Sequence, residues 1–280
     1  MTKPSFDQQF LRFTCISILL TIILMLFSND NNNMPYSYAL EEGQIQQPSS
    51  SNINASSVYL NHTMVLGNNI KHLVILIPNE AHESTNQPKD QYPLANQPYL
   101  PQKAIVSPNT MIIWFNADVD HDHRITILND ASSGNVLFDS GTFAFNEASK
   151  PVILNSPGTF GYYEANVNND DKSFVMNGTI SVASQQQQQL SFSNTNSTNN
   201  NSDIVGTYMV PTQDLDTYIS QFKHRALTVN GVYTFQDLRG GQEGTGDKQT
   251  LIVWGANSST MGFDKVISAL REITSELPYS

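Results

Sequence analysis

Cysteine is almost missing from this sequence of 280 residues, since the only one is Cys15, inside an apolar segment near the N-terminus. The rest of the chain therefore has no disulfide, no thiolate nucleophile and no thiolate metal ligand. Charged residues are also few, at 14%, and lysine and arginine form no run. The formal net charge of −11 argues against nucleic acid and anionic membrane surfaces as partners.

Only one long apolar run is present, at residues 13–27, and Lys3 and Arg12 precede it. This run has the length of the apolar part of a signal peptide and is shorter than the roughly 20 residues that span a bilayer. Cleavage and retention as an anchor both remain open. Residues 1–39 are therefore predicted to be a signal peptide or an N-terminal membrane anchor. The protein is expected outside the cytoplasm, either secreted or anchored to the outer face of the cell membrane.

Two stretches rich in Asn, Gln and Ser, residues 40–57 and 185–203, show no hydrophobic periodicity and are predicted to be linkers. They bound two candidate domains, residues 58–184 and 204–280. Because such linkers bury little apolar surface, we expect the two domains to fold independently.

Short strands separated by turn residues fill the first domain, and this spacing predicts a β-sandwich or barrel. The expected strands are 71–77, 104–106, 111–115, 125–128, 135–138, 152–154, 158–165 and 177–182. The second domain changes character, because apolar residues at helical spacing alternate with strands in the order β-α-β-β-α. That order predicts a small α+β domain, to which the sequence assigns no role.

Two histidines, His121 and His123, lie where the polar turn after strand 111–115 meets strand 125–128. Imidazoles held at a strand end can present nitrogen donors from a nearly rigid scaffold, as a transition-metal site requires. A solvated loop that happens to contain histidine explains the pattern equally well. The stretch therefore indicates a metal site without establishing one.

Three stretches of the first domain resemble the cupredoxins, the small copper-binding β-sandwiches. Residues 105–118, IVSPNTMIIWFNAD, are similar to the family's I-x-V-x-x-G-x-x-V-x-W-x-N-x-D, with Asn109 at the glycine position. Residues 158–164, GTFGYYE, are similar to G-x-Y-x-Y-Y-C, and residues 176–182, MNGTISV, to M-x-G-x-I-x-V. The resemblance covers about residues 68–183 and implies a mainly β protein with a cupredoxin-like Greek-key β-sandwich.

The resemblance places His123 and Met176 at two of the four metal-ligand positions of the family. At the cysteine position this chain has Glu164, and residues 165–174 contain no histidine to follow it. A blue centre with a thiolate-to-copper charge-transfer band therefore cannot form.

A different donor set is expected at the same end of the sandwich. In cupredoxins the turn after the first strand lies at the copper end, and here that turn carries His82. His82, His121, His123 and Glu164 would then converge, and nitrogen and oxygen donors of this kind suit Cu(II) or Zn(II). Met176 is either an axial ligand or a core residue, and Glu164 is either a ligand or a solvent-facing carboxylate.

These observations predict an exported copper-binding protein with a non-blue His/carboxylate centre, for electron transfer with a redox partner protein or for copper handling. The alternative is a metal-free cupredoxin fold that serves as an extracellular binding or assembly module. Oxidase or reductase activity would need an open coordination position and a substrate pocket. Neither is visible in the sequence, so no enzyme activity is predicted.

Overall fold

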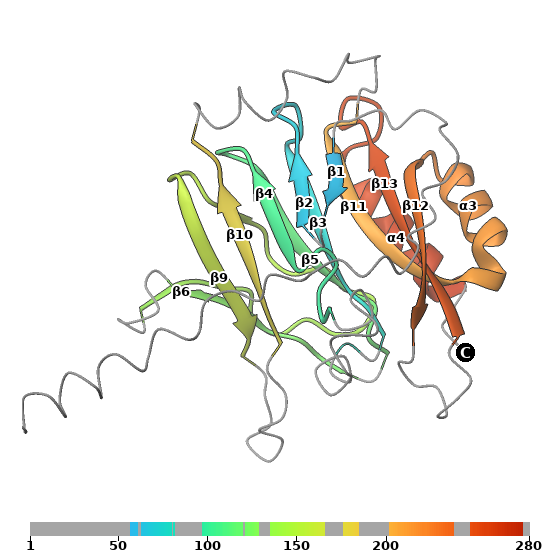
Figure 1. The fold of residues 1–280 in the computed structure, drawn as a ribbon, viewed down its shortest axis with the longest axis horizontal. Helices are drawn as coiled ribbons and strands as arrows, with labels where there is room; N and C mark the ends of the chain where they lie inside the picture. Colours follow the sequence, from blue (N-terminus) through green and yellow to red (C-terminus); the bar gives the residue numbers. More distant parts are fainter. Residues whose placement is uncertain are drawn as a thin grey trace, which may run out of the picture. The chain divides into compact units, whose positions relative to one another are not determined.

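The computed structural model describes residues 57–60, 63–79, 81, 97–119, 121–128, 135–165, 176–184, 202–237 and 247–276. All of these belong to one compact unit, residues 45–280. They form two β-sheets, which we call sheet A and sheet B, and two α-helices (Figure 1).

Sheet A contains seven of the described strands, all from residues 57–182. In spatial order they are β1 (Ser57–Leu60), β2 (Thr63–Leu66), β4 (Lys103–Val106), β10 (Asn177–Val182), β9 (Gly158–Glu164), β6 (Ile125–Leu128) and β7 (Val136–Asp139). Strand β4 pairs in parallel with both β2 and β10, and the other neighbours are antiparallel.

Sheet B contains six strands and draws on both candidate domains. In spatial order they are β12 (Thr228–Asp237), β13 (Asp247–Ala256), β11 (Ile204–Pro211), β3 (His72–Ile77), β5 (Met111–Asn116) and β8 (Val152–Ile153). The helices are α3 (Leu215–His224), which follows the short 3-10 turn η3 (Thr212–Asp214), and α4 (Phe263–Glu276).

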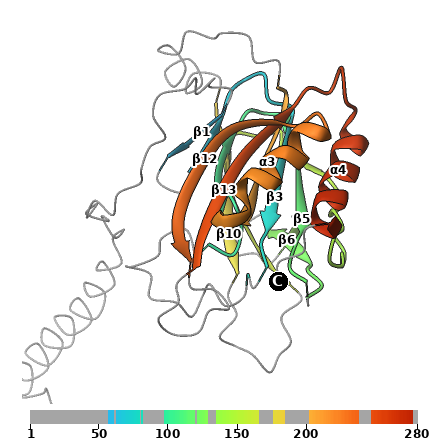
Figure 2. The same ribbon diagram turned by 90° about the vertical axis from the view of Figure 1, so that its right-hand side faces the viewer.

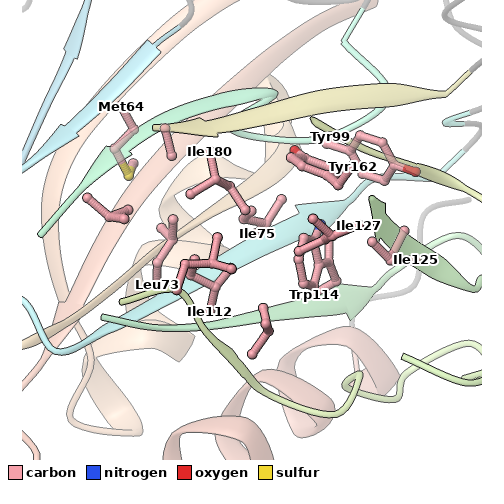
Figure 3. Packing of buried hydrophobic residues seen from close by; sticks show 14 of the residues in the cluster. Met64, Leu73, Ile75, Tyr99, Ile112, Trp114, Ile125, Ile127, Tyr162 and Ile180 are labelled. Carbon is pink, nitrogen blue, oxygen red and sulfur yellow. The ribbon is translucent and has the colours of Figure 1, made fainter. Parts of the chain in front are cut away.

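The main hydrophobic core fills the space between the two sheets. Trp114 of β5 is fully buried there and lies against the Tyr162 ring of β9, with 5.2 Å between the ring centroids. Figure 3 shows these rings among aliphatic side chains from both sheets, including Ile75, Ile127 and Ile180. Apolar residues alternate with polar ones along β10, which matches a strand that has one face in this core and one toward solvent.

A second core lies on the other face of sheet B, under the two helices (Figure 2). Strands β3 and β5 are buried at five successive positions each, so they contribute to both cores. Leu73 and Ile75 point between the sheets, whereas Val74 and Leu76 pack in the core that contains residues of α3 and α4. The structure is therefore layered as sheet A, sheet B and helices.

The link between the two candidate domains is a strand pair. Strand β11 pairs in parallel with β3, with Ile204 opposite His72 and Gly206 opposite Val74. Beyond these pairs the Thr207 hydroxyl donates to the Leu100 carbonyl. The β-α-β-β-α part thus extends the sheet of the sandwich and covers its outer face.

One departure from the family motifs, Asn109, and one match to them, Gly178, have local physical reasons. Asn109, at the motif's glycine position, has φ of 68°, a left-handed conformation that asparagine tolerates better than most residues. It lies in the turn that leads from β4 in sheet A to β5 in sheet B. Gly178 of β10 is needed for close packing, because a Cβ atom there would overlap the ring of Tyr162 on β9.

The expected fold class is confirmed, since a mainly β sandwich is followed by elements in the order β-α-β-β-α. The domain boundaries stay predictions, and residues 1–56 and 185–201, which include the expected N-terminal segment and most of both linkers, lie outside the described residues. Among the residues that are described, no helix is long and apolar enough to cross a membrane.

Candidate functional site

One end of the sandwich brings three segments together around a buried histidine. Asp118 follows the end of β5, His123 precedes the start of β6, and Glu164 is the last residue of β9. Strand pairing fixes their relative positions, because Ile125 lies opposite Glu164 and the Ala165 amide donates to the Arg124 carbonyl at 2.7 Å. The site is therefore set by the register of sheet A together with the turn that leaves sheet B.

His123 lies between two carboxylates. Its Nδ1 atom is 2.8 Å from Glu164 Oε2, and its Nε2 atom is 3.3 Å from Asp118 Oδ2. The other Glu164 oxygen, Oε1, accepts the backbone N–H of Arg124 at 2.8 Å. All three side chains are almost fully buried, so their charges are compensated mainly by one another.

The electrostatics of this arrangement favour a protonated imidazole. Burial by itself lowers the pKa of His123, but the hydrogen bonds to Asp118 and then to Glu164 outweigh burial and raise this pKa to about 9. At neutral pH His123 is thus an imidazolium that donates from both ring nitrogens. Asp118, His123 and Glu164, which we call the buried triad, then carry a net charge of −1 when both carboxylates are ionised.

Asn116, the last residue of β5, organises the turn that follows it. Its side-chain amide donates to the His121 carbonyl at 2.8 Å, and its side-chain oxygen accepts the Asp118 backbone N–H at 2.8 Å. The His121 Nδ1 atom lies 3.5 Å from Asp118 Oδ1, and 43% of this histidine side chain is exposed. Asp118 therefore faces one imidazole with each of its two oxygens.

The five residues predicted from the sequence as metal ligands fall into three groups. His121, His123 and Glu164 lie at the same end of the sandwich, and Glu164 is buried, so it is not the solvent-facing carboxylate that was the alternative. Met176 is 1% exposed and belongs to the core between the sheets, so it packs as a core residue. His82 lies outside the described residues.

Sequence reasoning missed Asp118, which makes the second contact to His123. Its signal was nevertheless present, because Asn116 and Asp118 are the N-x-D of the first family motif. The alternation of side chains along a strand does not show which way a carboxylate points in the turn that follows. The motif therefore indicated the end of the strand but not the contact of Asp118 with His123. Only the structure shows that Asp118 lies between His121 and His123.

The copper centre of the cupredoxins does not fit these residues. Glu164 replaces the thiolate, its two oxygens are already bonded to His123 and Arg124, and Met176 is enclosed in the core. Within the described ranges, no three His, Cys, Asp or Glu side chains are grouped as a metal site. The donors that are present, imidazole and carboxylate, are nevertheless those that suit Cu(II) and Zn(II) once the proton of His123 Nε2 is lost.

Comparison with known proteins gives structural matches only. No family model and no curated protein matches the chain. A purple cupredoxin from Nitrosopumilus maritimus is 19% identical, with 40% of this chain and 99% of that chain aligned and a TM-score of 0.28. Reduced auracyanin from Roseiflexus castenholzii is 13% identical over 41% and 98%, at a TM-score of 0.29. Rusticyanin from Thiobacillus ferrooxidans is 11% identical over 46% and 88%, at a TM-score of 0.32.

The first of these structures is named a cupredoxin, the family that the sequence motifs resemble. At such low identity and TM-score the matches carry no information on the metal, so the site must be judged on its own residues.

Proposed function

We propose that this end of the sandwich binds Cu(II) in a non-blue centre, with His121, His123 and Asp118 as ligands, and that the exported protein serves in copper handling. One observation carries most of the proposal: Glu164 Oε2 lies 2.8 Å from His123 Nδ1 while Nε2 is directed at the Asp118 carboxylate. Metal-binding histidines ordinarily donate their other ring N–H to a carboxylate, which fixes the ring orientation. Glu164 then acts through His123 and is not itself a ligand.

The spacing of the donor atoms supports this assignment. His123 Nε2 and Asp118 Oδ2 are 3.3 Å apart, and His121 Nδ1 and Asp118 Oδ1 are 3.5 Å apart. Two ligands that are each about 2.0–2.1 Å from an ion lie roughly 3.3 Å apart in the tetrahedral geometry of Zn(II), and roughly 2.9 Å apart at neighbouring positions of the tetragonal geometry of Cu(II), so both pairs would close by a few tenths of an ångström around copper. Metal binding would replace the Nε2 proton, and the half-exposed His121 side chain would turn toward the same ion.

The donor chemistry favours copper handling over electron transfer. Imidazole and carboxylate suit Cu(II), whereas Cu(I) selects soft thiolate and thioether ligands. The only such group near the family's ligand positions, Met176, is packed in the core. A site that holds one oxidation state far better than the other retains copper more readily than it cycles electrons to a partner protein. Zn(II) is the competing ion, because it accepts the same donors.

A second candidate function follows from the same histidine. With both ring nitrogens bonded to carboxylates and a pKa of about 9, His123 can keep its proton in place of a metal. The buried triad is then a structural element, and the protein is the metal-free extracellular binding or assembly module that was the alternative from sequence.

Titration of the metal-free full chain with Cu(II), followed by calorimetry and electron paramagnetic resonance, separates the two functions. Binding of one Cu(II) per chain without an intense blue absorption band is expected. His121→Ala and Asp118→Asn are each expected to weaken binding by at least about tenfold, in line with the loss of a group that contacts or orients a ligand. His82→Ala tests the remaining predicted ligand in the same assay.

His224→Ala is the matched control, because this histidine is exposed on α3. It should leave Cu(II) affinity unchanged, and thermal unfolding without metal should show that each variant is folded. The metal proposal is wrong if the wild-type chain does not bind Cu(II), or if His121→Ala and Asp118→Asn together leave its affinity unchanged. Tighter binding of Zn(II) than of Cu(II) would identify zinc as the ligand.

A further inference from the structure

The C-terminal β-α-β-β-α part contacts the loop of residues 140–151, which runs between β7 and β8 beside the candidate site. The Asn146 side-chain amide donates to the Ser275 hydroxyl of α4 at 2.7 Å, and the Arg271 guanidinium of α4 donates to the Asn146 carbonyl at 3.2 Å. Ala148 of the same loop packs against the apolar cluster that contains the buried face of α4. The helix therefore holds this loop by polar and apolar contacts.

The loop is in turn bonded to the residue that organises the histidine turn. The Asn146 backbone N–H donates to the Asn116 carbonyl at 2.8 Å, and the Asn116 backbone N–H donates to the Glu147 carbonyl at 2.9 Å. The loop also pairs with the buried triad directly, because Phe143 and His123 exchange two backbone hydrogen bonds of 2.9 and 3.0 Å. The loop therefore contacts α4 through Asn146 and the site through Phe143, Asn146 and Glu147.

Asn116 connects the loop to His121 and Asp118, the proposed ligands. Its side chain, which is fully buried, bonds the His121 carbonyl and the Asp118 amide and lies 3.5 Å from the Phe143 carbonyl. A shift of the loop must therefore move the backbone that carries both His121 and Asp118. Asn146, like Asn109, has a left-handed conformation, with φ of 64°, which asparagine adopts more readily than most residues.

We propose that α4, acting through Asn146 and Asn116, positions the turn that carries His121 and Asp118. The C-terminal part is then a positioning element for the site, and Arg271 and Ser275 are its contact residues. This inference rests on the proposed Cu(II) site. It assigns a role to residues 204–280, for which the sequence indicated none.

The test removes only the helix contacts, with the double variant Arg271→Ala/Ser275→Ala in the full chain. Cu(II) affinity is expected to fall about three- to tenfold, which corresponds to the net loss of one or two ordinary hydrogen bonds. The copper hyperfine splitting in electron paramagnetic resonance is expected to change as well, because the ligand arrangement relaxes. In the metal-free protein, the ring resonances of His121 should shift or broaden.

The conservative variant Arg271→Lys/Ser275→Thr keeps the hydrogen-bonding groups and should restore both affinity and hyperfine splitting. The matched control is Ser268→Ala, which removes a hydroxyl from α4 that bonds only the Asp264 carbonyl of its own helix. It should change neither.

The possible failures are distinguishable. If the wild-type chain binds no Cu(II), the proposed function is wrong. The proposal that α4 positions metal ligands is then wrong as well. If the wild-type chain binds Cu(II) and the double variant has the same affinity, hyperfine splitting and His121 resonances, the positioning role of α4 alone is overturned. A loss that Ser268→Ala reproduces would also overturn it, because the effect would then be one of helix stability.

Discussion

The two sheets of this protein differ in how their outer faces are covered. Sheet A leaves its outer face to solvent, so burial alternates along β10, and the edge strand β7 exposes Val136 and Leu137. Sheet B has cores on both sides, so β3 and β5 are apolar at nearly every position. Parallel pairing does not separate the sheets, because β3 pairs in parallel with β5 and β11 in sheet B and β4 pairs in parallel with β2 and β10 in sheet A.

The difference shows that the C-terminal part completes sheet B instead of standing beside it. Without α4 and α3, the residues of the second core that belong to the sandwich would form an apolar surface. The first motif segment, residues 105–118, contributes to both cores, because Trp114 lies between the sheets whereas Phe115 and Ala117 lie in the second core.

Deletion of residues 204–280 should have the largest effect, because it exposes the outer face of sheet B. Val74, Leu76 and Phe115 would lose their cover. Burial of each such side chain is worth about 1.5–3 kcal/mol, and a whole protein is stable by only about 5–15 kcal/mol. We expect the 58–184 fragment to bind a hydrophobic dye and to unfold without cooperativity in thermal circular dichroism. The linker composition predicts the opposite, that this fragment folds independently, and the same measurement decides between the two predictions.

A matched fragment with these three residues changed to threonine should regain solubility, since the outer face would then resemble that of sheet A. Cooperative unfolding of the unmodified 58–184 fragment at the temperature of the full chain would show that the second core contributes little.

Two leucines, one buried in sheet B and one exposed in sheet A, allow the same difference in coverage to be tested with single substitutions. Leu76 of sheet B is 1% exposed under the helices, and Leu137 of sheet A is 44% exposed. Leu76→Ala is expected to lower the free energy of unfolding by about 2–5 kcal/mol, whereas Leu137→Ala should change it by no more than about 0.5 kcal/mol. Urea unfolding of both variants measures the difference. Equal effects would mean that the two outer faces are equally covered in solution.

At one end of the sandwich the two sheets are connected by the hydrogen bonds of His123 to Asp118 and Glu164. These contacts predict that the stability of the protein depends on pH. Asp118 follows β5 of sheet B, His123 precedes β6 of sheet A, and Glu164 ends β9 of sheet A. The folded-state pKa of His123, about 9, lies above its ordinary value, so the stabilisation from its proton is complete below about pH 6.5 and is lost as the pH rises through 9. A shift of this size corresponds to on the order of 3 kcal/mol.

Chemical denaturation of the metal-free chain between pH 6 and 10 should show this loss. Glu164→Gln, which keeps the shape of the side chain, should lower the His123 pKa and move the loss to lower pH. Stability that is flat through pH 9 would show that His123 is not the titrating group.

The smallest effect is expected on the exposed face of sheet A, at the ion pair of Arg124 and Asp139. The Arg124 guanidinium, followed by the Gly141 amide, lowers the pKa of Asp139 to about 2. Arg124→Gln should raise this pKa toward its usual range in a nuclear magnetic resonance titration and leave thermal stability almost unchanged, because exposed pairs are screened by water and salt. A marked loss of stability would mean that the outer face of sheet A carries more of the fold than its exposure indicates.

Much of the fold was predictable from local patterns. The strands expected at 125–128 and 177–182 coincide with β6 and β10, and the β-α-β-β-α order after residue 203 is confirmed. The cover on sheet B also had a signal, since HLVILI and MIIWFN are apolar without alternation, which indicates burial on both faces. What no local pattern contained was the partner of that second face, because α4 lies more than 140 residues further along the chain.

The candidate site divides in the same way between sequence and structure. By itself the sequence determined that there is no thiolate centre, that histidines lie at a strand end, and that β-sandwich motifs surround them, because residue identity and short-range periodicity decide these properties. Only the tertiary structure decided that Asp118 and Glu164 enclose His123, that Met176 packs in the core, and that α4 reaches the site through Asn146. These contacts join residues up to 129 positions apart, and they exist only once strand register and layer packing have brought those residues together.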